Sequence, residues 1–240
     1  MVRNRDIASP ANDITLSGAG ILHGMRRLFL VSLFVAPFGV AFGAAAVEHG
    51  LGPVQATVMS LLVFTATAQF AALDLLGDQV AFLSLFLVTL TLSARHVVMG
   101  AALSGWINRL PVFKRAAALV LLSDANFADA HPALRDGSTD LGRFVGGGLM
   151  LWLVWGLSTA MGAFGGTHLG DTSAFGFGAI MVCFFAATMV RMLRASSGLL
   201  LPAMIAMLIS VITQPILPTG WNIMLAAVAG GALAIWRPHE

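Results

Sequence analysis

A few charged and hydrogen-bonding side chains lie inside apolar segments, and they are the first candidates for chemistry. The richest group is Arg95 and His96, with Asp124 further along the chain. A charge at the centre of a membrane helix costs about 2.5–3.5 kcal/mol, so it needs a partner or a function. Arg95 offers a planar fork that matches a carboxylate, and His96 can titrate near neutral pH. Asp124 can pair with Arg95, hold an ammonium group or carry a proton.

A structural ion pair that fixes helix packing explains the same three residues, so both interpretations stay open. Asp124 and Asp129 are five positions apart and point to different faces of a helix, which makes a poor metal clamp. The sequence predicts no metal site and no cofactor. It also lacks His-Glu-x-x-His, Gly-x-Ser-x-Gly and a phosphate-binding glycine loop, so we do not expect an enzyme.

Two further places carry polar or helix-breaking residues at membrane depth. Gln69 follows Thr65 by four positions in an apolar run, so the two share a helix face and the amide needs partners inside the protein. Pro37, with Gly39 and Gly43 close by, predicts a kinked or broken first helix. Freed backbone groups there can bind the charged ends of a small substrate. Interhelical packing without a ligand is the alternative at both places.

The composition shows what surrounds these residues. Hydrophobic residues make up 58% of the 240 residues and charged residues only 10%, with a mean hydropathy of +0.88. A soluble domain carries about 25% charged residues, so the sequence predicts an integral membrane protein. The net charge is +2, and no basic patch with interleaved aromatic residues is present, so we expect no nucleic acid partner.

Eight apolar stretches follow a polar segment, 1–24, which we interpret as a cytoplasmic tail. They predict an all-α bundle of seven to eight transmembrane helices in a single domain, 25–240, with some helices short or broken. The stretches are Leu28–Val47, Gln55–Leu76, Val80–Ile107, Ala116–Ala130, Phe144–Phe164, Ala174–Val190, Leu199–Thr213 and Trp221–Trp236. The glycine pairs Gly39/Gly43 and Gly162/Gly166 have the spacing that lets membrane helices approach closely. The sequence shows no clear internal repeat.

Positive residues indicate which side of the membrane each loop occupies. With a cytoplasmic N-terminus and eight crossings, nine Lys or Arg residues lie inside. Arg109, Lys114 and Arg115 lie outside, against the rule. A segment between Gln55 and Ala130 that does not fully cross the membrane removes the conflict, so seven crossings with a re-entrant piece is an alternative. The inside residues are Arg3, Arg5, Arg26, Arg27, Arg135, Arg143, Arg191, Arg194 and Arg237.

The motifs over 24–129 resemble those of the AzlC family, the large subunits of two-component branched-chain amino acid exporters. The resemblance rests on Pro-Phe-Gly at 37–39, Ala-Gln-Phe at 68–70, Arg-His at 95–96 and Ser-Asp at 123–124. This sequence has Ser93 and Ala125 where such families usually have Asn and Glu. The second half is similar to the family mainly in hydropathy.

The resemblance implies a permease in the inner membrane that exports small apolar amino acids, with the proton gradient as the driving force. It also implies a small hydrophobic AzlD-like partner subunit. Gln69, Arg95, His96 and Asp124 match motif positions of the family. Other possibilities are an accessory or scaffold membrane subunit that does not transport, and a membrane-embedded enzyme.

Overall fold

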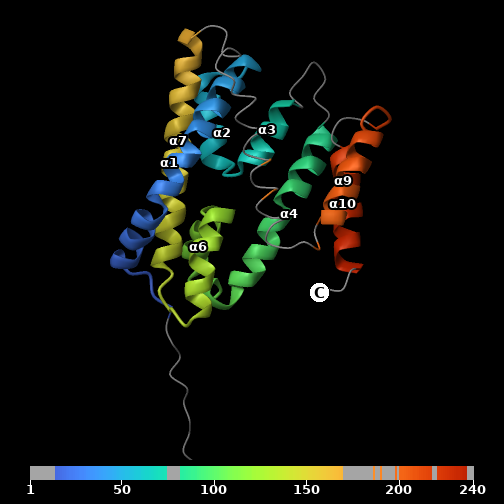
Figure 1. Ribbon diagram of the computed structural model, residues 1–240. Coiled ribbons are helices and arrows are strands. Elements are labelled where there is room, and N and C mark those ends of the chain that lie inside the picture. Colours follow the sequence, from blue (N-terminus) through green and yellow to red (C-terminus); the bar gives the residue numbers. More distant parts are fainter. Residues whose placement is uncertain are drawn as a thin grey trace, which may run out of the picture. The chain divides into compact units, whose positions relative to one another are not determined.

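The computed structural model describes residues 14–74, 82–169, 200–217 and 221–236, with the isolated residues 186, 190 and 198. The predicted stretch Ala174–Val190 and most of the predicted tail therefore lie outside the described residues. Within them the chain is helical, with one isolated bridge between Thr15 and Asp140 (Figure 1). The helices are α1 Gly18–Glu48, α2 Pro53–Leu62, α3 Ala66–Asp74, α4 Phe82–Ile107, α5 Val112–Val120, α6 Asp124–Arg135, α7 Gly142–Leu169, α9 Leu200–Thr213 and α10 Trp221–Trp236.

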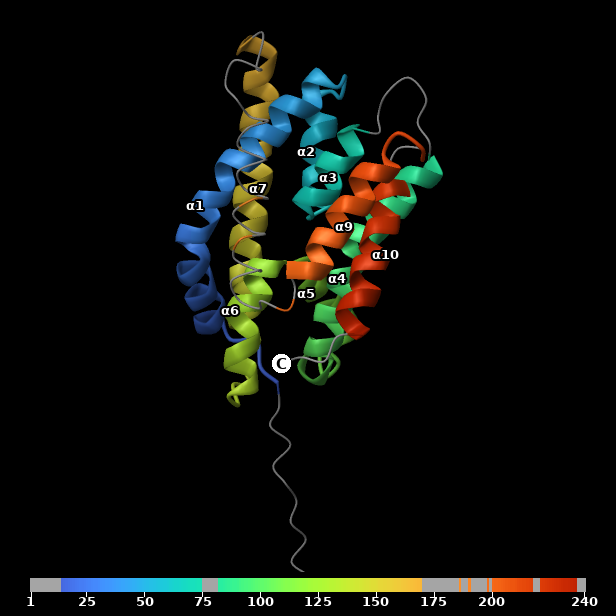
Figure 2. The same cartoon turned by 45° about the vertical axis from the view of Figure 1, so that its right-hand side comes forward.

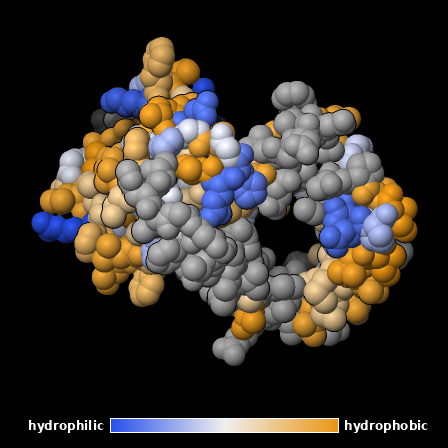
Figure 3. Space-filling view, turned by 90° about the horizontal axis from the view of Figure 1, so that it is seen from above, coloured by the Kyte–Doolittle hydropathy of each residue, from blue (hydrophilic) through white to orange (hydrophobic). Residues whose placement is uncertain are grey.

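Among the described residues, three helices are long and apolar enough to cross a membrane: Gly18–Glu48, Leu85–Ile107 and Gly142–Gly166. Large hydrophobic side chains also point outward, among them Phe34 at 78% and Phe113 at 90% exposure. Hydrophobic side chains dominate the coloured surface in Figure 3. An outward apolar surface of this extent is suited to lipid. The predicted helical membrane protein is therefore supported, and the number of seven to eight crossings stays a prediction.

The chain divides into two compact units, and α1, α4 and α7 each contribute to both. Unit 1 comprises Met1–Leu33 and His96–Leu153, and unit 2 comprises Phe34–Arg95 and Val154–Glu240. Unit 1 thus holds α5 and α6, whereas unit 2 holds α2, α3, α9 and α10.

Within each unit, α1 packs closely on α7 through glycines. In unit 2, a Cβ atom on Gly43 would overlap the carbonyl oxygen of Thr159, and one on Gly162 would overlap the carbonyl oxygen of Val40. In unit 1, a Cβ atom on Gly24 would overlap the carbonyl oxygen of Arg143. The close approach predicted from the glycine spacing is confirmed. Residue numbers rise together along both helices, so α1 and α7 run parallel (Figures 1 and 2).

The predicted run Gln55–Leu76 is two helices rather than one. Helix α2 ends at Leu62, and α3 begins at Ala66 after a three-residue break. The Nε2 of Gln69 donates to the Oγ of Ser60 at 3.1 Å. In a continuous helix these residues would be about 13 Å apart along the axis. The chain therefore folds back, and α2 and α3 form a hairpin.

Helices α9 and α10 form a second antiparallel pair in unit 2 (Figure 2). The Nδ2 of Asn222, near the start of α10, donates to the Oγ of Ser210, near the end of α9, at 3.4 Å. A Cβ atom on Gly230 would lie 2.9 Å from the Cβ of Ala206. This glycine therefore lets the two backbones approach closely.

Of the kink or break predicted at Pro37, the break is absent, since α1 is continuous through that residue, and the kink stays a prediction. The residue is exposed, and a proline on the outer side of a helix leaves the packed side intact. The interruptions lie instead between α2 and α3, and between α5 and α6. The latter divides the predicted run Ala116–Ala130 at 121–123.

Candidate functional site

A chain of four buried polar side chains links the α2–α3 hairpin to α7 in unit 2. The Nε1 of Trp155 donates to the Oε1 of Gln69 at 3.0 Å. The Gln69 amide in turn donates to Ser60, whose Oγ lies 2.9 Å from the Oγ1 of Thr159. The four residues are at most 2% exposed. Buried amides need partners on both ends, and Gln69 has them.

Aromatic rings pack around this polar chain. Phe42 of α1 meets Phe70 of α3 edge to face, with ring centroids 5.3 Å apart. It also stacks near Trp155, with centroids 6.3 Å apart and an angle of 25° between the rings. All three are buried or nearly so. Phe42, Phe70 and Trp155 thus form a packed aromatic cluster in this conformation.

Arg95 reaches the beginning of α3 from α4. One of its terminal nitrogens, NH2, donates to the Oγ1 of Thr67 at 3.2 Å. The guanidinium is exposed. Thr67 is the second residue of α3, so Arg95 lies at the first turn of the helix that carries Gln69. A cation beside the N-terminus of a helix makes a local positive field, which favours an anionic group.

The three candidates in α1 have different environments. Pro37 is exposed, whereas Gly39 and Gly43 are buried. A Cβ atom on Gly39 would overlap the Oγ of Ser158, which itself donates to the carbonyl of Val154 at 2.7 Å. The two glycines therefore serve helix packing in this structure. Their contribution to a substrate site stays a prediction.

His96 and Asp124 belong to unit 1. The Nδ1 of His96 is buried, and no described residue offers it a hydrogen bond. Asp124 is exposed and is the first residue of α6, where its carboxylate complements the helix dipole. Because Arg95 belongs to unit 2, its predicted pairing with Asp124 stays a prediction.

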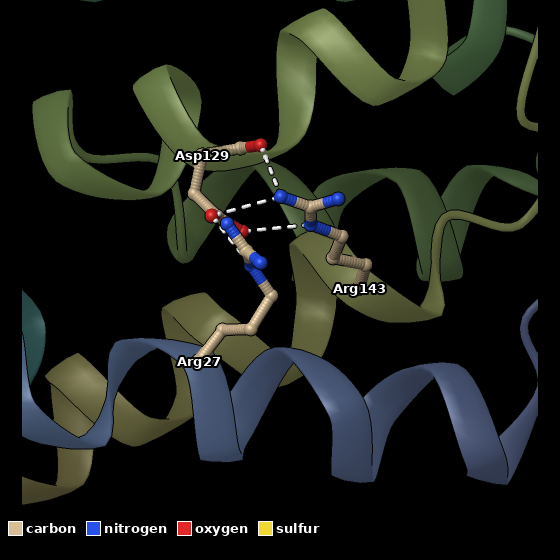
Figure 4. A network of polar contacts seen from close by, with 3 residues as sticks. All are labelled: Arg27, Asp129 and Arg143. Carbon is tan, nitrogen blue, oxygen red and sulfur yellow. Dashed lines mark hydrogen bonds and ion pairs between the residues drawn. The ribbon is translucent and has the colours of Figure 1, made fainter.

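An ionic cluster in unit 1 joins three helices around Asp129 of α6 (Figure 4). Arg143 of α7 donates its Nε to Oδ2 at 2.8 Å and its NH2 to Oδ1 at 2.9 Å. The Nε of Arg27, in α1, donates to Oδ1 at 2.9 Å. The Asp129 side chain is only 11% exposed, whereas that of Arg27 is 49% exposed. Arg143 therefore contributes the stronger bond of the two.

A second carboxylate, Asp140, joins the start of α1 to the start of α7. Its Oδ1 accepts from the backbone N–H of Gly142 at 2.7 Å and of Ser17 at 3.1 Å. The Ser17 hydroxyl donates to Oδ2 and accepts from the N–H of Gly20 at 2.8 Å. Partial burial raises the pKa of Asp140, but these hydrogen bonds outweigh it, so the pKa lies below its ordinary value.

The AzlC protein family matches residues 31–169, which is more than half of the chain and includes both the Gln69 network and Arg95. This protein belongs to the AzlC family. It is also similar to the inner membrane protein YgaZ of Escherichia coli (strain K12). The identity is 26% over 164 residues, which cover 67% of each chain. No solved structure matches.

Sequence reasoning missed the part of this polar network that α7 supplies. Trp155 and Thr159 were not singled out, because the second half was compared by hydropathy alone. The signal was present: Ser158 and Thr159 are adjacent hydroxyls inside the apolar run Phe144–Phe164, and Trp155 lies one turn before them. A polar pair at that depth needs partners, and here Thr159 lies against Ser60 of the hairpin.

Proposed function

We propose that this AzlC-family protein is a permease that exports branched-chain or similar small apolar amino acids, driven by the proton gradient. It works in the inner membrane with its N-terminus in the cytoplasm, beside a small hydrophobic AzlD-like subunit. The observation that carries the proposal is the guanidinium of Arg95 at the first turn of α3. The inner-membrane relative and the membership in the AzlC family support it.

The chemistry of a zwitterion assigns the roles. The substrate carboxylate needs a cation, and the fork of Arg95 matches it. The N-terminal end of α3 adds a partial positive charge to the same place. Gln69 positions α3 through its two hydrogen bonds. In unit 1, Asp124 carries the driving proton and His96 takes part in its transfer. A protein that only moves its substrate needs no catalytic group.

The pairing of the Gln69 amide at both ends favours a second candidate. An amide held on both ends is also what a purely structural link between helices requires. If the protein is a scaffold subunit that does not transport, any loss of activity caused by a polar substitution should be proportional to the loss of folded protein. A permease predicts that Arg95→Ala loses transport at an unchanged protein level.

The experiment measures export of labelled valine, leucine, isoleucine and methionine from cells loaded with the matching dipeptides. The chain is expressed alone, with its small partner, and as Arg95→Ala or Arg95→Lys with the partner. Arg26→Ala is the matched control, because Arg26 is likewise an exposed arginine of a long apolar helix. We expect export by the wild type and by the control, loss in Arg95→Ala and partial recovery in Arg95→Lys, which restores the charge but not the fork.

Two results would contradict the proposal. Wild-type export by Arg95→Ala would remove Arg95 from the substrate site. Absence of export of all four amino acids by folded wild-type protein with its partner would reject an apolar amino acid exporter and favour the scaffold.

A further inference from the structure

Two segments of the chain have the same order of helices and similar residues at matching places. In each, a long helix is followed by Pro-Val, a short helix, a three-residue break and a second short helix. The Pro-Val pairs are at 53–54 and 111–112, and the breaks are 63–65 and 121–123. Beyond the break, residues 67–71 are Thr-Ala-Gln-Phe-Ala and residues 124–128 are Asp-Ala-Asn-Phe-Ala. The sequence alone showed no clear internal repeat, but together with the helix boundaries this correspondence makes α1–α3 and α4–α6 internal repeats and pairs Gln69 with Asn126.

Asn126 matches Gln69 in burial and in its contact with α7, but not in its hydrogen bonds. Both side chains are fully buried. The Nδ2 of Asn126 donates to the carbonyl of Leu121, in the break, at 3.0 Å. Its Oδ1 is buried with no hydrogen-bond partner among the described residues. An unpartnered buried acceptor costs about 1–3 kcal/mol, so a donor that binds there is favoured.

The α5–α6 segment of unit 1 folds back as α2–α3 does in unit 2. Leu110, just before α5, and Leu134, near the end of α6, belong to one buried cluster. A straight helix would hold them about 36 Å apart. Helix α6 runs antiparallel to α7, since Asp129 bonds Arg143 while Asn126 packs on Gly147, one turn further along α7. Each segment therefore returns to the side from which it started.

This path resolves the conflict with the positive-inside rule. If each hairpin returns to the side of the membrane from which it enters, α4 is the one crossing between α1 and α7. One crossing between them explains why α1 and α7 run in the same direction. Arg109, Lys114 and Arg115 then lie on the same side as Arg26 and Arg143. Many transporters are built from such inverted repeats, and they bind their substrates at interrupted helices.

We propose that Asn126 is the counterpart of Gln69 on a second re-entrant hairpin, and that within unit 1 its Oδ1 binds the ammonium group of the transported amino acid at one step of transport. This inference rests on the proposed function. The oxygen can only accept, and an ammonium group offers three donors. Because Oδ1 is buried against Gly147, the substrate reaches it only when the hairpin moves away from α7.

The first test determines the path of the chain in the membrane. Single cysteines replace Asn108, Asp136 and His49, all of them exposed, in a chain carrying Cys183→Ser. A thiol reagent that cannot cross membranes is applied to intact cells and to inverted vesicles. We expect Asn108→Cys and Asp136→Cys to label from the same side and His49→Cys from the other. Labelling of Asn108→Cys and Asp136→Cys from opposite sides would overturn the second hairpin.

The second test varies the ammonium group and its acceptor. Unlabelled leucine and N,N,N-trimethylleucine, which has no N–H, compete with labelled leucine for uptake into inverted vesicles, the direction that corresponds to export from the cell. Asn126→Leu removes Oδ1. Gly147→Ala leaves Asn126 intact but places a Cβ 2.9 Å from Oδ1 and 2.7 Å from a methyl of Leu28. Gly105→Ala is the control, because a Cβ there meets no atom within 4 Å.

We expect the half-saturating leucine concentration to rise about tenfold or more in Asn126→Leu and in Gly147→Ala. The preference of the wild type for leucine over the trimethyl analogue falls in both variants and persists in Gly105→Ala. An unchanged preference in folded Gly147→Ala and Asn126→Leu overturns the role of Asn126, whereas export by the wild type upholds the proposed function. If the wild type neither exports leucine nor is stabilised by it against heat, both proposals fail.

Discussion

Replacing Gln69 by leucine tests whether the buried polar chain holds the α2–α3 hairpin on α7. The substitution keeps a side chain of similar size and removes both hydrogen-bonding ends. The N–H of Trp155 then loses its acceptor, 3.0 Å away. Ser60 loses one donor but keeps Thr159, at 2.9 Å. Only one group is left without a partner, so the cost is that of one buried N–H.

The size of this cost follows from two ranges. An unsatisfied buried donor costs about 1–3 kcal/mol. Hydrogen bonds between membrane helices average about 0.6 kcal/mol and reach about 1.7 kcal/mol. Leucine recovers part of the loss by burying apolar surface. We therefore expect the free energy of unfolding to fall by about 1–2 kcal/mol.

The assay follows helicity by circular dichroism as SDS is added to protein in mixed micelles. Trp155→Phe and the double variant complete a cycle, in which we expect the two changes to be strongly non-additive because they share one bond. Thr91→Val is the control, since the Thr91 hydroxyl donates only to Leu87 of its own helix, at 2.8 Å. An unfolding free energy that Gln69→Leu does not lower, or additive effects of the two single changes, would refute the link.

Three further contacts are tested by substitution, the first two with a comparison variant. Gly43→Leu drives α1 away from a backbone carbonyl of α7 and should cost about 1–3 kcal/mol in the SDS assay, whereas Gly105→Leu, which faces open space, should leave the unfolding curve unchanged. Asp129→Asn weakens the ionic cluster and should lower the unfolding free energy by about 1–2 kcal/mol, whereas Arg27→Ala, at the half-exposed partner, should change it by less than about 1 kcal/mol. Asp140 has a lowered pKa, so its charge stabilises the fold above the ordinary value of 3.8. The excess thermal stability of the wild type over Asp140→Asn should be complete at pH 7 and disappear as the pH falls through that lowered pKa; a constant difference would contradict the assignment.

Hydropathy and residue spacing predicted the long helices and their packing. Spacing by four puts Gly39 and Gly43 on one face, and only glycine lets the backbones of α1 and α7 approach as they do. The need of Gln69 for partners also followed from its position, since an amide at membrane depth has no water to bind. The identity of those partners did not follow, because Trp155 comes from α7, 86 residues further on, and Ser60 comes from the other arm of a hairpin.

The two hairpins could not be predicted from hydropathy, because a straight crossing and a fold-back bury the same apolar residues. The first break, Val63-Phe64-Thr65, contains neither glycine nor proline, so no local signal marks it. Pro37 gave a strong local signal, yet α1 is continuous there. Tertiary contacts, here the bond between Ser60 and Gln69, stabilise the turn that local propensity does not specify.

Gln69 and Asn126 are both buried amides, but they differ in their hydrogen bonds. This difference separates a structural role from a binding role. Gln69 has a partner at each end, so its substitution should act first on stability. Asn126 has a hydrogen-bond partner only for its Nδ2, so the loss of its Oδ1 breaks no hydrogen bond among the described residues. A variant that covers this oxygen, as Gly147→Ala does, should therefore impair substrate affinity more than stability. The opposite pattern is expected for Gln69→Leu, and the contrast between the two positions tests whether an unpartnered atom marks the substrate path.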